Sequence, residues 1–375
     1  MGKIEHTPSE AIRVGRRWAE TYALSFALNV LVPELVSALG HWLPNPEQAQ
    51  FCGLGEGSSF SGAGLWRVEH GEGIYVLRRW PQAESKGCNI TRVSWLQRHL
   101  AEAGLPIASP LSLLEHPEAV DFTKISINRD VATWTLSPWL PGAADYWITP
   151  RPTKLKAALR TLAEIHLAAV SFPVGDKAGR ARTDRSPALV KRADRLEGLK
   201  SAEWAELNYH LAKTPPTAER EAAFEALELI HRSLGRLWYE SLRWCDEPLP
   251  LQWVIRDVWH DHVLFTEDKV TGVIDFGAAA VDSPAGDVAR LLGSLVGDDE
   301  AAWRLGIEAY QRERSLSPVE LEAIRYFDAS GTLLSAFNWV HWLFRDPTAV
   351  GKEVDRGAAQ RRLERLIARL RCMET

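Results

Sequence analysis

The chain has 375 residues, 46% of them hydrophobic and 25% charged, which is enough apolar material for a sizeable core and excludes intrinsic disorder, collagen and coiled coil. Lys and Arg number 44 and Asp and Glu 49, so the formal net charge of -5 argues against a nucleic-acid-binding protein. The four cysteines form no CxxC pair, and this spacing favours a reducing cytoplasm over a disulfide scaffold or a zinc site.

The sequence favours a cytoplasmic protein that does not span a membrane. The first twenty residues are charged and lack the apolar core of a leader peptide. The most apolar stretch, 22–43, is interrupted by Asn29, Pro33, Glu34 and His41. We therefore expect a packed helical segment there, with Pro33 as a break or kink, and not a membrane span.

A small β-rich region is expected after an N-terminal helical extension over residues 1–50. A stretch rich in Gly and Ser opens it, and a helix is predicted at 90–103, where apolar residues recur at helical spacing until Gly104 and Pro106 end the pattern. Strand-like runs lie at 65–69, 74–80, 124–128 and 132–136. We place this N-terminal lobe at 51–136.

Two prolines and a glycine at 137–142 (Ser-Pro-Trp-Leu-Pro-Gly) interrupt the strand pattern and predict a hinge. Helices are predicted to dominate the larger lobe that follows, at 143–375. Helical patterns cover 155–169, then 186–244 with a break at 214–216, and then 285 to the end; short strands are expected at 253–255, 263–266 and 270–274.

The chemically informative stretch lies at 253–277. Asp257 follows a short apolar run, His262 comes five residues later, and Asp275 follows a predicted hairpin that returns the chain to the loop of Asp257. Phosphoryl transfer from ATP needs such a set, because one carboxylate orients the attacking hydroxyl while a second carboxylate and a neighbour hold the metal that bridges the phosphates.

These residues resemble the aminoglycoside phosphotransferase and choline kinase-like family. The run 255–262 (IRDVWHDH) is similar to its catalytic loop, and 273–277 (VIDFG) to its metal-binding motif. Asp282-Ser283-Pro284 with Asp287, and 162–166 (LAEIH), are similar to two further segments of that family. The resemblance covers about 51–295 and implies a bilobal, protein-kinase-like α+β fold.

By this resemblance the cofactors are ATP and Mg²⁺, and the partner is a small molecule with a hydroxyl group. Asp257 is the implied catalytic residue, Asp275 and His262 are the implied metal ligands, and Arg256 and Asp287 are supports of the catalytic loop. The implied nucleotide contacts are Gly55, Gly57, Ser58 and Ser59 of the glycine-rich loop, Arg78 on a strand, and Ser137 and Trp139 at the hinge.

Three positions depart from the family pattern. His262 stands where the family has a metal-binding Asn, so it is expected to ligate a metal such as Mn²⁺, to act through water, or to leave Asp275 as the main ligand. Arg78 replaces the usual strand lysine, and since Arg79 must point to the opposite face, the family pattern selects Arg78. The following helix has no Glu at the usual ion-pair position, where Thr91 and Arg92 lie.

Two other function classes stay open. The altered positions also fit a nucleotide-binding pseudokinase or scaffold with little catalysis. If residues 260–262 are extended, His260 and His262 share one face, which would suit a metal-dependent hydrolase. For a kinase, the sequence names no acceptor: antibiotic, sugar, amino alcohol and amino acid all fit.

Overall fold

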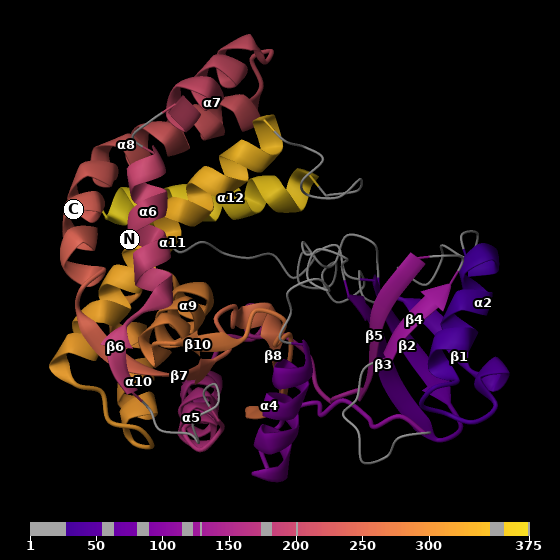
Figure 1. The fold of residues 1–375 in the computed structure, drawn as a ribbon. Coiled ribbons are helices and arrows are strands. Elements are labelled where there is room, and N and C mark those ends of the chain that lie inside the picture. Colours follow the sequence, from indigo (N-terminus) through magenta and orange to yellow (C-terminus); the bar gives the residue numbers. More distant parts are fainter. Residues whose placement is uncertain are drawn as a thin grey trace. The chain divides into compact units, whose positions relative to one another are not determined.

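The structure is a computed structural model that describes residues 28–54, 64–80, 90–114, 123–127, 130–173, 182–199, 202–345 and 356–373. The chain divides into two compact units (Figure 1). The first unit comprises the residues up to Trp95 together with Ala108–Leu140, and the second comprises Leu96–Ile107 together with the chain from Pro141 onward. The expected division into a sheet-containing part and a mostly helical part is confirmed.

The first unit is built on an antiparallel sheet whose strand order is β1-β2-β3-β5-β4. Its strands are β1 (Gln50–Gly53), β2 (Gly64–His70), β3 (Gly73–Trp80), β4 (Thr123–Ile127) and β5 (Asp130–Pro138). The four expected strands are confirmed, and β1 is an addition. Gly71 allows the tight β2–β3 turn because its φ of 58° lies in the left-handed region.

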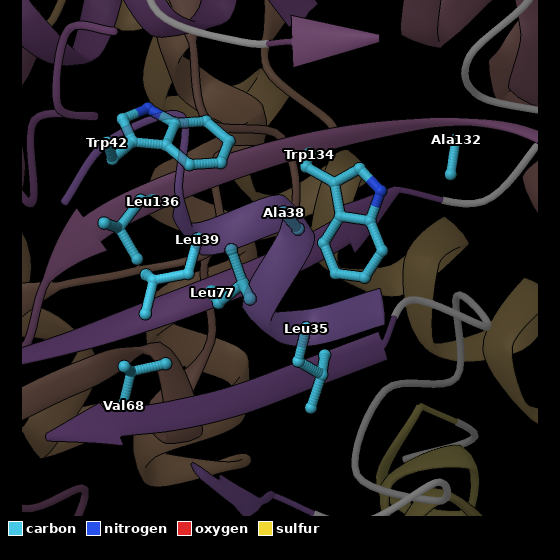
Figure 2. Packing of buried hydrophobic residues seen from close by; sticks show 9 residues of the cluster. All are labelled: Leu35, Ala38, Leu39, Trp42, Val68, Leu77, Ala132, Trp134 and Leu136. Carbon is cyan, nitrogen blue, oxygen red and sulfur yellow. The ribbon is translucent and has the colours of Figure 1, made fainter. Parts of the chain in front are cut away.

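Helix α2 (Leu28–Leu39) packs against one face of this sheet (Figure 2). Leu35 and Leu39 of the helix lie with Leu77, Trp134 and other apolar side chains in one buried cluster. The helix that the sequence assigned to an N-terminal extension thus contributes to the core of the first unit. A short 3-10 helix, η2 (Pro46–Gln48), leads from it into β1.

Arg78 and Arg79 of β3 point to opposite faces of the sheet, and α2 covers one of these faces. Arg79 approaches Glu34 of α2 at 3.7 Å, so its side chain lies on the face that α2 covers. Arg78 therefore projects from the opposite face, where its guanidinium lies 4.0 Å from the ring of Trp80.

The second unit is mostly helical. Its helices are α5 (Pro152–Ala169), α6 (Pro187–Leu199), α7 (Ala202–Lys213), α8 (Ala218–Trp244), α9 (Pro284–Val296), α10 (Glu300–Gln311), α11 (Pro318–Phe344) and α12 (Arg356–Cys372). The predicted break at 214–216 separates α7 from α8, where Thr217 caps α8 by accepting a hydrogen bond from the backbone N–H of Arg220. Helix α4 (Ile90–Glu102) contains the division between the units.

Two small sheets lie among these helices. One has the order β10-β7-β6, with β7 (Pro248–Val254), β6 (Arg182–Arg185) and β10 (Ala280–Asp282). The other is the predicted hairpin, β8 (Val263–Thr266) with β9 (Lys269–Val273). Strand β7 begins five residues before the expected run, because Pro248–Leu251 pairs with β6, whose exposed polar residues carry no hydrophobic pattern. Among the described helices, none is long and apolar enough to cross a bilayer.

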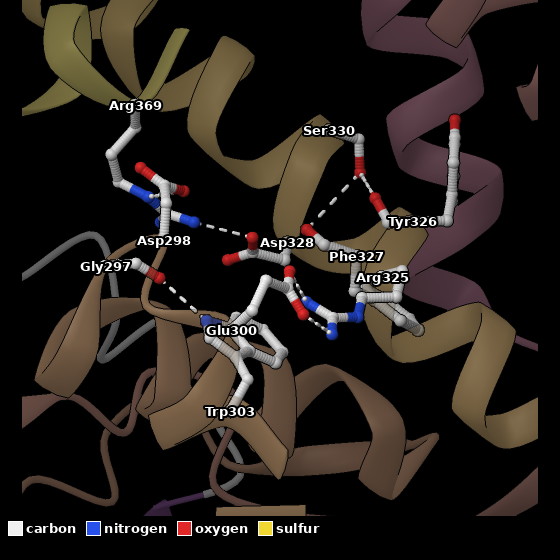
Figure 3. A network of polar contacts seen from close by, with 10 residues as sticks. All are labelled: Gly297, Asp298, Glu300, Trp303, Arg325, Tyr326, Phe327, Asp328, Ser330 and Arg369. Atoms are coloured by element: carbon white, nitrogen blue, oxygen red, sulfur yellow. Dashed lines mark hydrogen bonds and ion pairs between the residues drawn. The ribbon is translucent and has the colours of Figure 1, made fainter. Parts of the chain in front are cut away.

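Helix α12 is tied to the rest of the unit by an arginine between two carboxylates (Figure 3). Arg369 donates to Asp328 of α11 at 2.6 Å and to Asp298, just after α9, at 3.1 Å. Burial raises the pKa of Asp328, and the Arg369 charge acts in the opposite direction. The apolar side of α12 is buried as well, through Leu363, Ile367 and Leu370. These contacts fix the helix in position.

Trp134→Ala is expected to destabilise the first unit by about 3–5 kcal/mol, because it removes a fully buried indole from the sheet–helix core. Trp134→Phe is the matched control and should cost much less, since the indole N–H has no acceptor among the described residues. Urea unfolding measures both variants. Equal losses would contradict this account of the core.

Arg369→Leu is expected to cost up to about 3–5 kcal/mol, because it leaves the buried carboxylate of Asp328 without its ion-pair partner. Arg369→Leu combined with Asp328→Leu should recover much of the loss, since the buried charge is then removed. The free energy of unfolding in urea tests this. A single variant as stable as the wild type would show that the pair does not hold α12.

Candidate active site

The loop after β7 carries Asp257, and a buried carboxylate holds the backbone of this loop. The N–H groups of Ile255 and Arg256 donate to the two oxygens of Asp287 at 2.7 Å each. Asp287 lies in the first turn of α9 and is fully buried. Arg256 has a φ of 69°, a conformation that costs about 1–3 kcal/mol in a residue other than glycine and that such hydrogen bonds can maintain.

Asp287 has a third partner in His166, near the C-terminal end of α5. The His166 Nε2 lies 3.1 Å from the carboxylate, and its Nδ1 lies 2.7 Å from the hydroxyl of Tyr310. Burial lowers the pKa of His166 and raises that of Tyr310, so the imidazole is neutral and the hydroxyl keeps its proton. Nε2–H therefore donates to Asp287, and Nδ1 accepts from Tyr310.

The carboxylate of Asp257 faces solvent beside an arginine. Its side chain is 49% exposed, and its Oδ1 accepts a hydrogen bond from Arg290 of α9 at 3.0 Å. Arg256, the preceding residue, points elsewhere: its Nε lies 3.9 Å from Asp282, which also accepts a hydrogen bond from the hydroxyl of Ser186. In this arrangement Arg256 is placed to support the loop.

His262 links the catalytic loop to the hairpin and uses both ring nitrogens to do so. The indole N–H of Trp259 donates to its Nε2 at 2.7 Å. This assigns the proton to Nδ1, which donates to the backbone carbonyl of Asp257 at 2.8 Å. As placed, the ring has no free lone pair for a metal, although its Nε2 lies only 3.8 Å from a carboxylate oxygen of Asp275. Of the three readings of His262, this geometry favours the one that leaves Asp275 as the main ligand.

Asp275 follows β9 in a second strained conformation. Its φ of 62° is in the left-handed region, and its carboxylate is 37% exposed. The backbone N–H of Ile274 donates to the carbonyl of His262 at 3.0 Å, so the loops of the two aspartates are joined through one residue. Strained residues other than glycine cluster at functional sites, which makes this pair of loops a candidate active site.

The structure does not place the two histidines of the catalytic loop on one face. Residues His260–His262 form a 3-10 turn and not an extended strand, and the ring of His260 stacks on Trp147 with centroids 3.3 Å apart. Burial, reinforced by the charge of Arg362, lowers the pKa of His260 to about 2. In the part of the chain that the structure describes, no group of three or more His, Cys, Asp or Glu is arranged to hold a metal.

Helix α12, at the other end of the sequence, also contributes to these surroundings. The guanidinium of Arg362 lies 3.6 Å from the ring centre of Trp259, and that of Arg365 lies 3.9 Å from the ring centre of Trp147. Neither arginine could be predicted from the sequence, where His166 stood out only as part of the segment 162–166. No motif joins these residues to the catalytic loop, because the contacts are made across 80 or more residues of chain.

The expected nucleotide contacts belong to the first unit. The guanidinium of Arg78 lies over the ring of Trp80, and Ser137 lies in β5 opposite Val76 of β3. The side chain of Trp139 is 37% exposed, and the guanidinium of Arg67 lies 5.5 Å from its ring centre. The other expected contacts, Gly55, Gly57, Ser58 and Ser59, lie outside the described residues.

Known proteins of similar sequence and fold are small-molecule kinases. A homoserine kinase of Caulobacter vibrioides (strain NA1000 / CB15N) is 25% identical over 283 residues, which are 73% of this chain and 76% of that kinase. In fold, the chain is similar to an amicoumacin kinase bound to AMP-PNP and Ca²⁺ (TM-score 0.57, 14% identity, 95% of each chain). It is also similar to a microcompartment-associated aminopropanol kinase (TM-score 0.56, 14% identity, 91% of this chain and 96% of that one).

The model of the phosphotransferase enzyme family matches residues 54–322, which include the catalytic loop, the hairpin and Asp287. Most of the chain is covered by this match. The chain therefore belongs to the phosphotransferase enzyme family.

Proposed function

We propose that this chain transfers the γ-phosphoryl group of ATP to a hydroxyl group of a small molecule. One observation carries the proposal: two part-exposed carboxylates, Asp257 and Asp275, lie on loops that His262 joins, through its ring to one and its carbonyl to the other. Family membership supports the same reaction class.

Asp257 is the proposed catalytic residue. Its exposed carboxylate would accept a hydrogen bond from the acceptor hydroxyl and orient the oxygen toward the γ-phosphorus. The new bond joins that oxygen to phosphorus, the bond to the β,γ-bridging oxygen breaks, and ADP leaves while Asp257 takes the hydroxyl proton. Asp287 holds the backbone of the loop, and this would keep the carboxylate of Asp257 directed toward the acceptor hydroxyl.

Asp275 is the proposed protein ligand of a divalent metal. Its carboxylate fits Mg²⁺, a hard cation that typically takes one or two protein carboxylates and completes its shell with phosphate oxygens and water. When bound, the metal neutralises charge on the phosphates of ATP. Mn²⁺ was expected only if the imidazole of His262 bound the metal, and both nitrogens of this ring are already used in hydrogen bonds.

The nucleotide contacts stay part of the proposal. Arg78 would clamp phosphate oxygens with its forked N–H groups, and the segment from Ser137 to Trp139 would contact the adenine. The glycine-rich loop with Gly55, Gly57, Ser58 and Ser59 would present backbone N–H groups to the phosphates.

A nucleotide-binding protein with little catalysis is the second candidate. One observation favours it: Arg290 donates to the carboxylate that would receive the acceptor hydroxyl. The two candidates differ in turnover, since only the enzyme releases ADP in step with a phosphorylated acceptor.

Asp257→Asn is expected to lower kcat by about 100- to 10,000-fold, because the amide cannot take the hydroxyl proton. Formation of ADP with a panel of hydroxyl acceptors that includes homoserine and aminopropanol measures this. Asp268→Asn is the control, since Asp268 is a part-exposed carboxylate in the turn of the β8–β9 hairpin, where it pairs with Arg151. A variant with full activity would refute the role of Asp257.

Asp275→Ala is expected to abolish the metal-dependent part of nucleotide binding. In the wild type, ATP with Mg²⁺ at 100 times its dissociation constant adds about 2.7 kcal/mol, which raises the melting temperature by a few degrees. Thermal unfolding with ATP, with and without Mg²⁺, tests this, and Asp268→Ala should behave as the wild type. A shift in the wild type that does not depend on metal would instead support the nucleotide-binding candidate.

A further inference from the structure

We propose that Arg290 and Arg362 form a binding site for an anionic group, a carboxylate or a phosphate, on the phosphoryl acceptor. The site lies beside Asp257, on the catalytic loop, and two helices distant in sequence supply its charges. This inference rests on the proposed function and deepens it, because it selects among the acceptor classes that the sequence leaves open.

Both guanidinium groups are gathered around one indole. The group of Arg362 on α12 lies 3.6 Å from the ring centre of Trp259, and that of Arg290 on α9 lies 5.8 Å from the same centre. A guanidinium carries its N–H donors along its edge, in a fork that matches carboxylate and phosphate oxygens. One donor of Arg290 is used by Asp257, and the charges of Arg290 and Arg362 act on each other, so the two groups lie close together beside the indole.

Arginines from two helices gather around this loop. Arg290, Arg362 and Arg365 approach it, and the carboxylates of the loop itself are Asp257 and Asp261. The carboxylate of Asp275 lies 3.8 Å from His262, where the proposed divalent metal would balance its charge. Burial lowers the pKa of Arg362 to about 10, with the charge of Arg290 acting in the same direction, so Arg362 stays cationic at neutral pH. An anion between the two guanidiniums would relieve their mutual repulsion, whereas a polycationic acceptor would increase it.

The position of Arg362 is fixed by the remainder of its helix. Seven residues on, which is two turns along the same side of α12, Arg369 is held by Asp298 and Asp328 (Figure 3). Arg365, between them, stacks on Trp147. One side of the helix therefore carries an arginine row that is anchored at one end and reaches the catalytic loop at the other.

The distances also limit the size of the acceptor. Arg290 contacts the carboxylate of Asp257 directly, at 3.0 Å. An anion bound to Arg290 and a hydroxyl bound to Asp257 must therefore be separated by only a few bonds. A short hydroxy acid or a short phosphorylated alcohol meets this condition.

The test uses two pairs of acceptors that differ by one anionic group: homoserine against propanolamine, and glycerophosphate against glycerol. The wild type should prefer the anionic member of at least one pair, and which pair responds distinguishes a carboxylate from a phosphate. Arg362→Gln should lower this preference, measured as the ratio of kcat/KM values, by about 10- to 100-fold, as for the loss of one charge-assisted hydrogen bond.

Two further variants separate a binding role from a structural one. Arg362→Lys keeps the charge and should retain part of the preference. Arg371→Gln removes the same charge from the same helix, where the arginine pairs with Glu225, and should leave the preference unchanged. The melting temperature of each variant shows whether it folds, and the ratio of two acceptors cancels a general loss of active protein.

Binding without turnover provides the second readout. The anionic member of the preferred pair should stabilise the protein loaded with AMP-PNP, which does not transfer its terminal phosphoryl group, and Mg²⁺ against heat, and its uncharged or cationic partner should not. Equal preference for both members, or a ratio that Arg362→Gln leaves unchanged, overturns the inference. Nucleotide stabilisation that persists while neither anion binds also overturns it, with the proposed function intact. Absence of metal-dependent nucleotide binding would instead refute the proposed function.

Discussion

The candidate active site depends on one buried carboxylate. Asp287 accepts hydrogen bonds from two consecutive backbone N–H groups and from His166, and a carboxylate with several donors is stable in the interior where an unpaired one is not. Because it lies in the first turn of α9, the helix dipole also favours its charge. The left-handed backbone of Arg256 is maintained by these bonds, and the direction of Asp257 follows from it.

His262 extends this constraint to the second loop. The ring of His262 donates to the carbonyl of Asp257, and its own carbonyl accepts from the N–H of Ile274, so the backbones of the two loops are linked. An asparagine at this position would offer a metal an oxygen ligand. The two nitrogens of the imidazole are instead used in hydrogen bonds with Trp259 and with the backbone of the loop. As placed, His262 braces the two loops, and its ring offers no lone pair to a metal.

Local patterns predicted much of the fold and the middle of the site. The strands β2, β3, β8 and β9 and the loops of Asp257 and Asp275 could be placed because their signals lie within a few residues of one another. Strand β6 could not be found, since its four exposed polar residues resemble any turn. The engagement of both nitrogens of His262 was equally hidden, because it depends on the direction in which Trp259 points.

The contacts of His166, Arg290 and Arg362 could not be predicted from the sequence at all. Arg290 and Arg362 join the catalytic loop to two helices, and His166 of α5 reaches the loop only through Asp287; tertiary packing alone selects these partners. The two carboxylates proposed to act in the transfer lie within one short stretch of chain, whereas the arginines beside them come from α9 and α12. Phosphoryl transfer needs the same chemical groups whatever the acceptor is, whereas the residues that recognise the acceptor differ from one acceptor to another. Under the proposed function, Arg362 of α12 would select the charge of the acceptor while Asp257 and Asp275 carry the transfer, and the two roles meet at Trp259, which lies against Arg362 and donates to His262.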